Sequence, residues 1–215
     1  MKDTCKILHR WFNALRRYRS SFAEELESIP KNGIYIIFEK GETYDGLDRI
    51  VRIGTHTGNN QLRSRLYQHF TKENKDRSIF RKNIGRCFLN KESNPYLKVW
   101  NLDLTTKERR KKNASLINEA FQSQIEKKIS RYIQGNLSFA VIEVDNKEER
   151  LYLESRIVST ISLCGRCKPS FTWLGLYSPK DRIRESGLWQ VNELYKEQLS
   201  DGDIKRLEIL IEKHN

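Results

Sequence analysis

The segments GIYIIF (residues 33–38) and IVRI (residues 50–53) decide the fold of this chain. Both are rich in β-branched and aromatic residues, which favour β-strands. The segment between them, EKGETYDGLDR (residues 39–49), is polar and contains two glycines. This pattern predicts an antiparallel hairpin whose strands are short and whose connection is a wide loop.

The sequence around this hairpin predicts a third strand and several helices. The segment SFAVIEV (residues 138–144) has the composition of a strand. Apolar residues at helical spacing predict helices over residues 5–28, 61–70, 113–134 and 148–163, one containing Ile79 to Phe88, and a short charged one beginning near Asp201. The expected fold class is α+β, a small three-stranded antiparallel sheet flanked by helices.

The length of the chain and its few breaks indicate one domain. A chain of 215 residues suits a single core, and no Pro/Gly/Ser-rich linker divides it. We therefore expect one domain over residues 1–215, elaborated by a basic helical insertion over residues 71–135.

The charge of the chain points to an anionic partner. The formal net charge is +12 at pH 7, and the commonest large anion in cells is nucleic acid. A basic surface that is merely solvated is the alternative. Because there is no apolar run of membrane-spanning length and no apolar leader, we expect no membrane partner and a cytoplasmic protein.

One acidic residue interrupts an apolar helix face. In EERLYLESRIVSTISL (residues 148–163), Leu151, Val158 and Ile161 recur at helical spacing, and Glu154 falls on the same face. A carboxylate in that position loses solvation, so it needs a cation, a network of donors or a chemical role. Two interpretations are open: a glutamate tied to an arginine, or a carboxylate that binds a metal ion.

Four motifs occur in an order that resembles the GIY-YIG nuclease family. They are Gly33-Ile34-Tyr35, Arg52-Ile53-Gly54, an arginine followed by His69 on a helix, and a later helical glutamate, Glu154. The family is named for the first two tripeptides, and the resemblance covers residues 32–70 and 138–175. It implies a three-stranded antiparallel sheet with flanking helices, and hydrolysis of phosphodiesters with one divalent metal ion held by the glutamate.

The resemblance assigns roles to individual residues. Glu154 would hold Mg²⁺ (or Mn²⁺), and Arg65 would neutralise charge on the scissile phosphate, with Arg63 as its near competitor. His69 would orient a water, a tyrosine hydroxyl or a phosphate, unless it is an ordinary surface histidine. Tyr35 would act as general base or place the attacking water, unless it is a core aromatic of its strand.

Two positions depart from the family pattern. Arg52 stands where the family usually has tyrosine, and a guanidinium is a very poor base, although it can bind phosphate or polarise Tyr35. Thr172 falls where the family often has an asparagine. The prediction is a metal-dependent DNA endonuclease. The alternatives are a catalytically weak or inactive nucleic-acid-binding protein on the same fold, or a basic domain that binds protein or RNA and matches the motifs by chance.

Further residues are candidates for contact with nucleic acid. Arg77, Arg81, Lys82 and Arg86 fall roughly along one helix face and, with Arg63, are predicted to contact backbone phosphates, unless that face is simply solvated. Trp173 and Trp189 would stack on an unpaired base or, alternatively, close an edge of the core.

The cysteines leave one question open. Cys164 and Cys167 have the CxxC spacing of a zinc half-site or a redox pair, but no second CxxC or CxxH is present. A zinc site would have to recruit Cys5, Cys87 or His69. Free thiols are the interpretation that the sequence favours.

Overall fold

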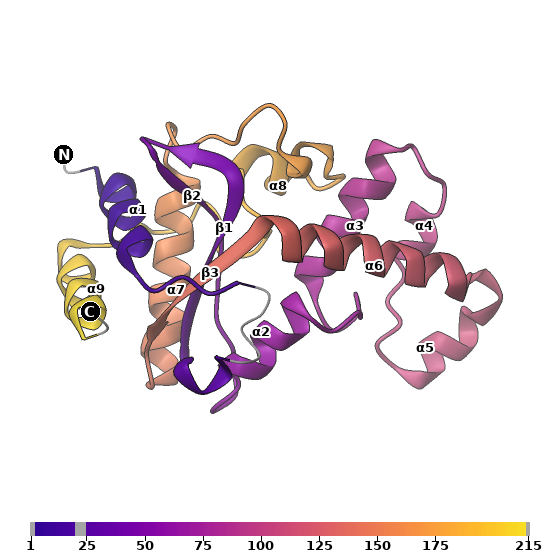
Figure 1. Ribbon diagram of the computed structural model, residues 1–215, viewed down its shortest axis with the longest axis horizontal. Helices are drawn as coiled ribbons and strands as arrows, with labels where there is room; N and C mark the ends of the chain where they lie inside the picture. The colour runs from indigo at the N-terminus through magenta and orange to yellow at the C-terminus, as the bar shows by residue number, and fades with distance from the viewer. Residues whose placement is uncertain (1–2, 20–24, 214–215) are drawn as a thin grey trace.

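The sheet has three antiparallel strands in the order β2-β1-β3, as predicted. The computed structural model describes residues 3–19 and 25–213. The strands are β1 (Gly33–Tyr44), β2 (Leu47–Gly54) and β3 (Leu137–Glu143), and they lie in the left half of Figure 1. The fold class is therefore α+β, a small antiparallel sheet with helices around it.

The hairpin of β1 and β2 is longer than predicted, and the expectation of a wide loop over residues 39–49 is wrong. The strands continue until Tyr44 pairs with Leu47. Only Asp45 and Gly46 lie between these partners, both with positive φ (54° and 76°), as a tight two-residue hairpin turn requires. The polar residues fit the strands because Glu42 and Arg49 form a buried salt bridge, with 2.7 Å between Oε2 and Nη2.

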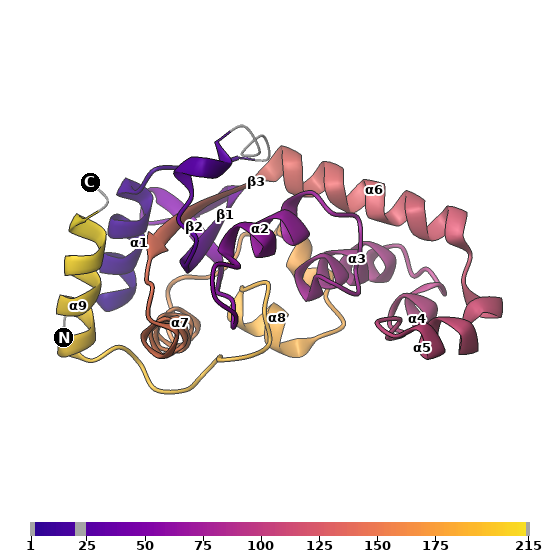
Figure 2. The ribbon, with the colours of Figure 1, turned by 90° about the horizontal axis from the view of Figure 1, so that it is seen from below.

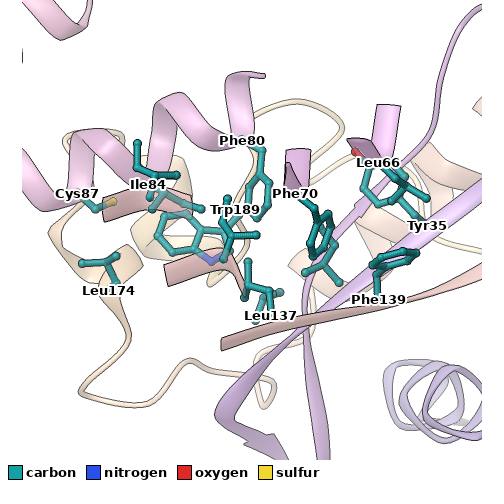
Figure 3. Packing of buried hydrophobic residues seen from close by; sticks show 14 of the residues in the cluster. Tyr35, Leu66, Phe70, Phe80, Ile84, Cys87, Leu137, Phe139, Leu174 and Trp189 are labelled. Carbon is teal, nitrogen blue, oxygen red and sulfur yellow. The ribbon is translucent and has the colours of Figure 1, made fainter. Parts of the chain in front are cut away.

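Alternating residues of β1 face two separate cores. Ile34, Ile36 and Phe38 pack with apolar residues of α1 (Thr4–Ala14), α7 (Lys147–Ser162) and α9 (Asp201–Glu212). Tyr35 and Ile37 pack on the other face with α2 (Leu62–Phe70), α3 (Ile79–Lys91) and α6 (Glu119–Asn136). Figure 3 shows part of this second core, including Tyr35, Phe70 and Phe139.

The first helix is shorter than predicted. Helix α1 ends at Ala14, and Tyr18 forms an antiparallel bridge with Phe139 of β3, so the expectation of a helix over residues 5–28 is wrong after Ala14. Residues 20–24 of that prediction lie outside the described part of the chain. The bridge prevails because it pairs the backbone groups of Tyr18 while its ring stacks on Phe139.

The remaining helices are short or lie away from the sheet. The predicted helix over residues 113–134 begins at Glu119, since the Asn118 side chain caps the N–H of Phe121. The others are α4 (Leu97–Trp100), α5 (Lys107–Lys112), α8 (Asp181–Ser186) and 3₁₀ turns at Leu26–Ser28, Ala114–Leu116 and Leu174–Tyr177. Figure 2 shows α3 to α6 at one end of the molecule and α1 and α9 at the other.

Candidate active site

The glycines of both tripeptides make room for close contacts. A Cβ on Gly33 would lie 2.2 Å from the carbonyl oxygen of Ile142, so this glycine lets β3 approach β1. A Cβ on Gly54 would lie 2.2 Å from Oη of Tyr35. Gly54 therefore allows the phenol ring of Tyr35 to lie across the end of β2.

One pocket, with a volume of about 210 Å³, gathers four of the five predicted catalytic residues. Tyr35 and Arg52 come from neighbouring strands, and their register puts them on one face, because Arg52 is paired with Ile37, two residues from Tyr35. Arg65 comes from α2 and Glu154 from α7. The other lining residues are Ile53, Thr55, Ile79, Asn83, Gln190, Val191, Asn192 and Glu193.

The fifth predicted residue, His69, lies directly behind the pocket. Its Nε2 is 2.9 Å from Oη of Tyr35, and its Nδ1 is 2.7 Å from Oγ of Ser78. The ring is fully buried, which excludes an ordinary surface histidine. Burial, followed by the charges of Arg65, Arg52 and Arg81, holds the pKa of His69 well below its usual value, so the imidazole is neutral at physiological pH.

Tyr35 is both a core residue and a pocket residue. Its ring is 1% exposed and packs in the second core, while its hydroxyl meets His69 and receives a long hydrogen bond of 3.4 Å from Nε of Arg52. Arg52 is anchored by a second hydrogen bond of 2.5 Å from Nη1 to the carbonyl of Trp189. The guanidinium is thus held beside the phenol at the pocket wall.

Glu154 is half-buried on α7 and faces the pocket. Burial raises the pKa of its carboxyl to about 7, although the charge of Arg52, a backbone hydrogen bond from Thr55 and the charge of Arg65 act in the opposite direction. Among the described residues, no arginine or lysine forms a salt bridge with Glu154. The interpretation of Glu154 as a glutamate tied to an arginine therefore does not hold.

The apolar face that Glu154 was expected to interrupt loses one predicted residue and gains two. Val158 and Ile161 are buried, but Leu151 is partly exposed, and Leu153 and Ile157 are buried instead. The carboxyl lies at the margin of the apolar face, where α7 meets the pocket, rather than within it.

The two candidate arginines of α2 have different environments. Nη1 of Arg65 donates to Gln68 and to the carbonyl of Arg77, both at 3.2 Å, and the side chain borders the pocket. Arg63 instead donates to the carbonyl of Ile29 and forms a salt bridge with Glu27. Arg63 does not line the pocket, so Arg65 is the arginine in position to meet a bound phosphate.

The basic stripe predicted on α3 is not a solvent-facing surface. Arg81 is fully buried and donates to Glu126 through Nε (3.0 Å) and Nη2 (2.9 Å). Lys82 and Arg86 are also buried, with partners that include Asp76, Asn83, Asn101 and the carbonyl of Leu102. These three cations hold the α3–α6 region together, so the prediction of exposed phosphate contacts is wrong for them. Arg77 is exposed and stays a prediction.

Thr172 is wrong as the counterpart of the family's asparagine in the pocket. It is exposed, its hydroxyl shares a hydrogen bond with Ser170, and it is not among the lining residues. The amides that line the pocket include Gln190 and Asn192, which follow much later in the chain. Counting residues from Pro169 missed them because the chain returns to β2 only at Trp189 and Gln190, which form hydrogen bonds with Val51 and Ile53.

Sequence reasoning also missed supporting residues. Ser78 is both the N-cap of α3 and the partner of His69, and a capping signal before Ile79 was visible in the sequence. Glu193 lines the pocket and adds a negative charge near Glu154, but no motif marks it.

The two tryptophans belong to the core. Trp173 and Trp189 are buried, their ring centroids lie 4.9 Å apart, and both indole N–H groups donate to Oε2 of Glu39. Trp189 also lies edge-on to Phe80 of α3, next to it in Figure 3. The alternative interpretation, in which these rings close an edge of the core, is confirmed.

Tyr35, Arg65 and Glu154 thus converge on one pocket at the end of the sheet, beside the two glycine-bearing tripeptides. The family model described as GIY-YIG domain matches residues 4–215, and the chain belongs to this family. Membership implies a nuclease, that is, a phosphodiester hydrolase with nucleic acid as substrate. No curated protein and no solved structure matches the chain. Among the helices of the described residues, none has the length and apolarity needed to cross a membrane.

Proposed function

We propose that the protein is a metal-dependent DNA endonuclease that uses Glu154 to hold Mg²⁺ or Mn²⁺. One observation carries this proposal: Tyr35, Arg52, Arg65 and Glu154 line a single pocket, and the carboxyl of Glu154 forms no salt bridge with any of the described residues. Burial of a carboxylate without a salt bridge costs free energy, and such a carboxylate suits a site where a cation binds during function.

The residues of the pocket fit a hard divalent cation. Mg²⁺ prefers oxygen ligands and is usually held by one or two carboxylates together with waters and substrate phosphates. Glu154 supplies one such carboxylate, and Glu193 lines the same pocket. When bound, the metal ion would polarise a phosphoryl oxygen and stabilise the charge of the transition state.

Tyr35 is the group placed to handle the proton of an attacking water. We assign the single ring proton of neutral His69 to Nε2, since Ser78 can donate its hydroxyl to Nδ1 while accepting the N–H of Arg81. Nε2–H and Nε–H of Arg52 then both donate to the Tyr35 oxygen. The two donors hold the Tyr35 oxygen at the pocket wall, which supports Tyr35 as the general base.

The two arginines of the pocket, Arg65 and Arg52, would have different roles. Arg65 borders the pocket and retains donors for a phosphate, which its planar fork matches well. Arg52 has committed Nη1 to a backbone carbonyl and Nε to Tyr35. Arg52 is therefore better suited to hold Tyr35 in place than to replace the family tyrosine as a base.

DNA as the substrate rests on charge. The net charge of +12 is accompanied by the exposed Arg77 and by the basic helix α5, whose side chains face solvent. We propose that residues 71–135 act as an insertion within a single domain and supply these contacts. A cytoplasmic setting agrees with the four free cysteines, because reducing compartments keep thiols unpaired.

Cleavage assays on the full chain test this function. Purified protein is incubated with supercoiled plasmid, single-stranded DNA and branched DNA in the presence of Mg²⁺ or Mn²⁺. We expect wild-type protein and Glu148→Gln, a change in an exposed carboxylate on the same helix, to cleave equally. Glu154→Gln should bind the DNA without cutting it. Equal nicking by wild type and Glu154→Gln would reject the proposal.

The replacement at Arg52 supplies the second candidate, a nucleic-acid-binding protein without cleavage. Salt-sensitive binding with no cleavage in any metal would favour it. The diagnostic variant is Arg52→Tyr, which restores the usual family residue. If it gains cleavage that wild type lacks, the natural chain has kept the fold and lost the chemistry.

A further inference from the structure

Three sulfur atoms and one imidazole gather on the face of the sheet opposite Tyr35. Cys5, His9 and Cys167 are buried, and their potential ligand atoms all lie within 4.8 Å of one another. Cys164 is half-buried and lies beside Cys5, next to this group of three. The cluster therefore contains four side chains of the kinds that bind zinc.

The local structure brings these residues together from two distant parts of the chain. Cys5 and His9 are four residues apart on α1, so they lie on one helix face. Helix α7 ends at Ser162, and the CxxC pair follows in the next turn. Packing of α1 beside α7, visible in Figure 1, places the two pairs against each other.

The spacing of the ligand atoms suits tetrahedral zinc. Nε2 of His9 is 3.5 Å from Sγ of Cys167. Zinc binds sulfur at about 2.3 Å and nitrogen at about 2.0–2.1 Å, so a tetrahedral site separates these two atoms by about 3.5 Å. A hydrogen bond between an imidazole and a thiol has a similar length. The nearby thiols of Cys5 and Cys164, however, supply the two further ligands that a tetrahedral site needs.

The orientation of His9 is that of a metal ligand. Nδ1 is 2.8 Å from the carbonyl oxygen of Cys5, so it carries the proton and Nε2 offers a lone pair. Ligating histidines usually donate their other N–H to a carbonyl or carboxylate in this way. In this structure the N–H of Ile50 donates to Nε2 at 3.2 Å. Zinc would replace this donor, and one hydrogen bond is a small loss beside zinc coordination.

We propose that Cys5, His9, Cys164 and Cys167 bind one zinc ion in a closed, structural site that fastens α1 to the turn after α7. Its three sulfurs and one nitrogen are the ligand set of many structural zinc sites. The site differs in chemistry and in place from the pocket of Glu154, which offers oxygen ligands. The proposal does not depend on nuclease activity.

The test measures zinc in the full-length protein. Protein from zinc-supplemented cells is purified under reducing conditions and analysed by elemental mass spectrometry. We expect about one zinc per chain in wild type, and at least about a ten-fold loss in Cys167→Ser and Cys164→Ser. Cys87→Ser is the matched control, because Cys87 is a buried free thiol outside the cluster. Both Cys87→Ser and Glu154→Gln should retain the zinc.

A second measurement covers variants that fail to fold. Wild-type protein is stripped of zinc and titrated with Co²⁺, which should give the intense visible absorption of a tetrahedral thiolate site and should be displaced by zinc. A zinc-specific chelator should lower the melting temperature of wild type and leave that of Cys164→Ser unchanged. Less than about a tenth of a zinc per chain with no cobalt spectrum, or a Cys5–Cys167 disulfide in freshly purified protein, would overturn the proposal.

Discussion

Two carboxylates removed from bulk solvent, the buried Glu126 between α3 and α6 and the half-buried Glu154 at the pocket, have different surroundings. Burial raises the pKa of both. Glu126 accepts two hydrogen bonds from Arg81 and one of 2.6 Å from the backbone of Lys75. Glu154 has no salt bridge among the described residues and opens to a cavity. A buried charge with all its partners is structural, whereas one without them is a candidate for function.

The largest expected effect is a loss of folding stability when Glu126 loses its cationic partner. Arg81→Met leaves Glu126 buried without its cation, and removing one partner of a buried pair typically costs about 3–5 kcal/mol. Urea unfolding followed by circular dichroism should show this loss. The double variant Arg81→Met/Glu126→Leu should recover much of it. A loss below about 1 kcal/mol in the single variant would mean that the pair is not a main support of the α3–α6 region.

The next effect concerns the unsatisfied carboxylate. Glu154→Gln should lower the cleavage rate at least about 100-fold, since it removes the anionic ligand of the metal ion while keeping the shape of the side chain. The rate is measured under single-turnover conditions in saturating Mg²⁺. Tyr35→Phe should give a comparable loss if the phenol takes the proton of the water. A loss smaller than about three-fold in Glu154→Gln would remove that residue from the chemistry.

A smaller expected effect is the dependence of stability on pH that the raised pKa of Glu154 causes. Because the folded pKa of Glu154 is about 7 and its ordinary value is 4.5, the folded state binds the proton more tightly than the unfolded state. The contribution of Glu154 to stability is therefore fully present below about pH 4.5 and is lost as pH rises to about 7. Without metal, Glu154→Gln should be more stable than wild type at pH 8 by about 1–3 kcal/mol.

Thermal unfolding in a chelating buffer at pH 5 and pH 8 measures this difference. The difference in melting temperature between Glu154→Gln and wild type should be larger at pH 8. Mg²⁺ should reduce this difference, because it binds and stabilises wild type alone. Equal gaps at the two pH values would show that the carboxyl titrates as an ordinary exposed one.

The smallest expected effect comes from a single exposed cation. Arg77→Ala should weaken DNA binding only a few-fold and reduce the dependence of log K on log salt by about one. Fluorescence anisotropy at several salt concentrations measures both. Lys205→Ala, an exposed change on α9 at the opposite end of the molecule, should leave binding unchanged. Equal effects of the two variants would indicate a general charge effect rather than a binding surface.

Local patterns predicted the sheet and the residues around its end, but not the partners of polar side chains. The composition of residues 33–38 and 138–144 was enough to predict two of the strands. The hairpin was predicted, but its polar extension over residues 39–49 was taken for a loop, because the Glu42–Arg49 pair that lets polar residues occupy a buried strand forms only across the sheet. The stripe on α3 was mistaken for surface because the partners of Arg81, Lys82 and Arg86 come from other segments.

The sequence by itself determined the fold class, the family motifs and the placement of an acidic residue next to the apolar face of a helix. These follow from local spacing, which the periodicity of helices and strands fixes. Only the tertiary structure decided which charges are neutralised, which amides reach the pocket, and that Cys5 and His9 meet Cys164 and Cys167. Those outcomes depend on contacts between residues far apart in the chain, and the free energy of a buried polar group is set by such contacts rather than by its neighbours in sequence.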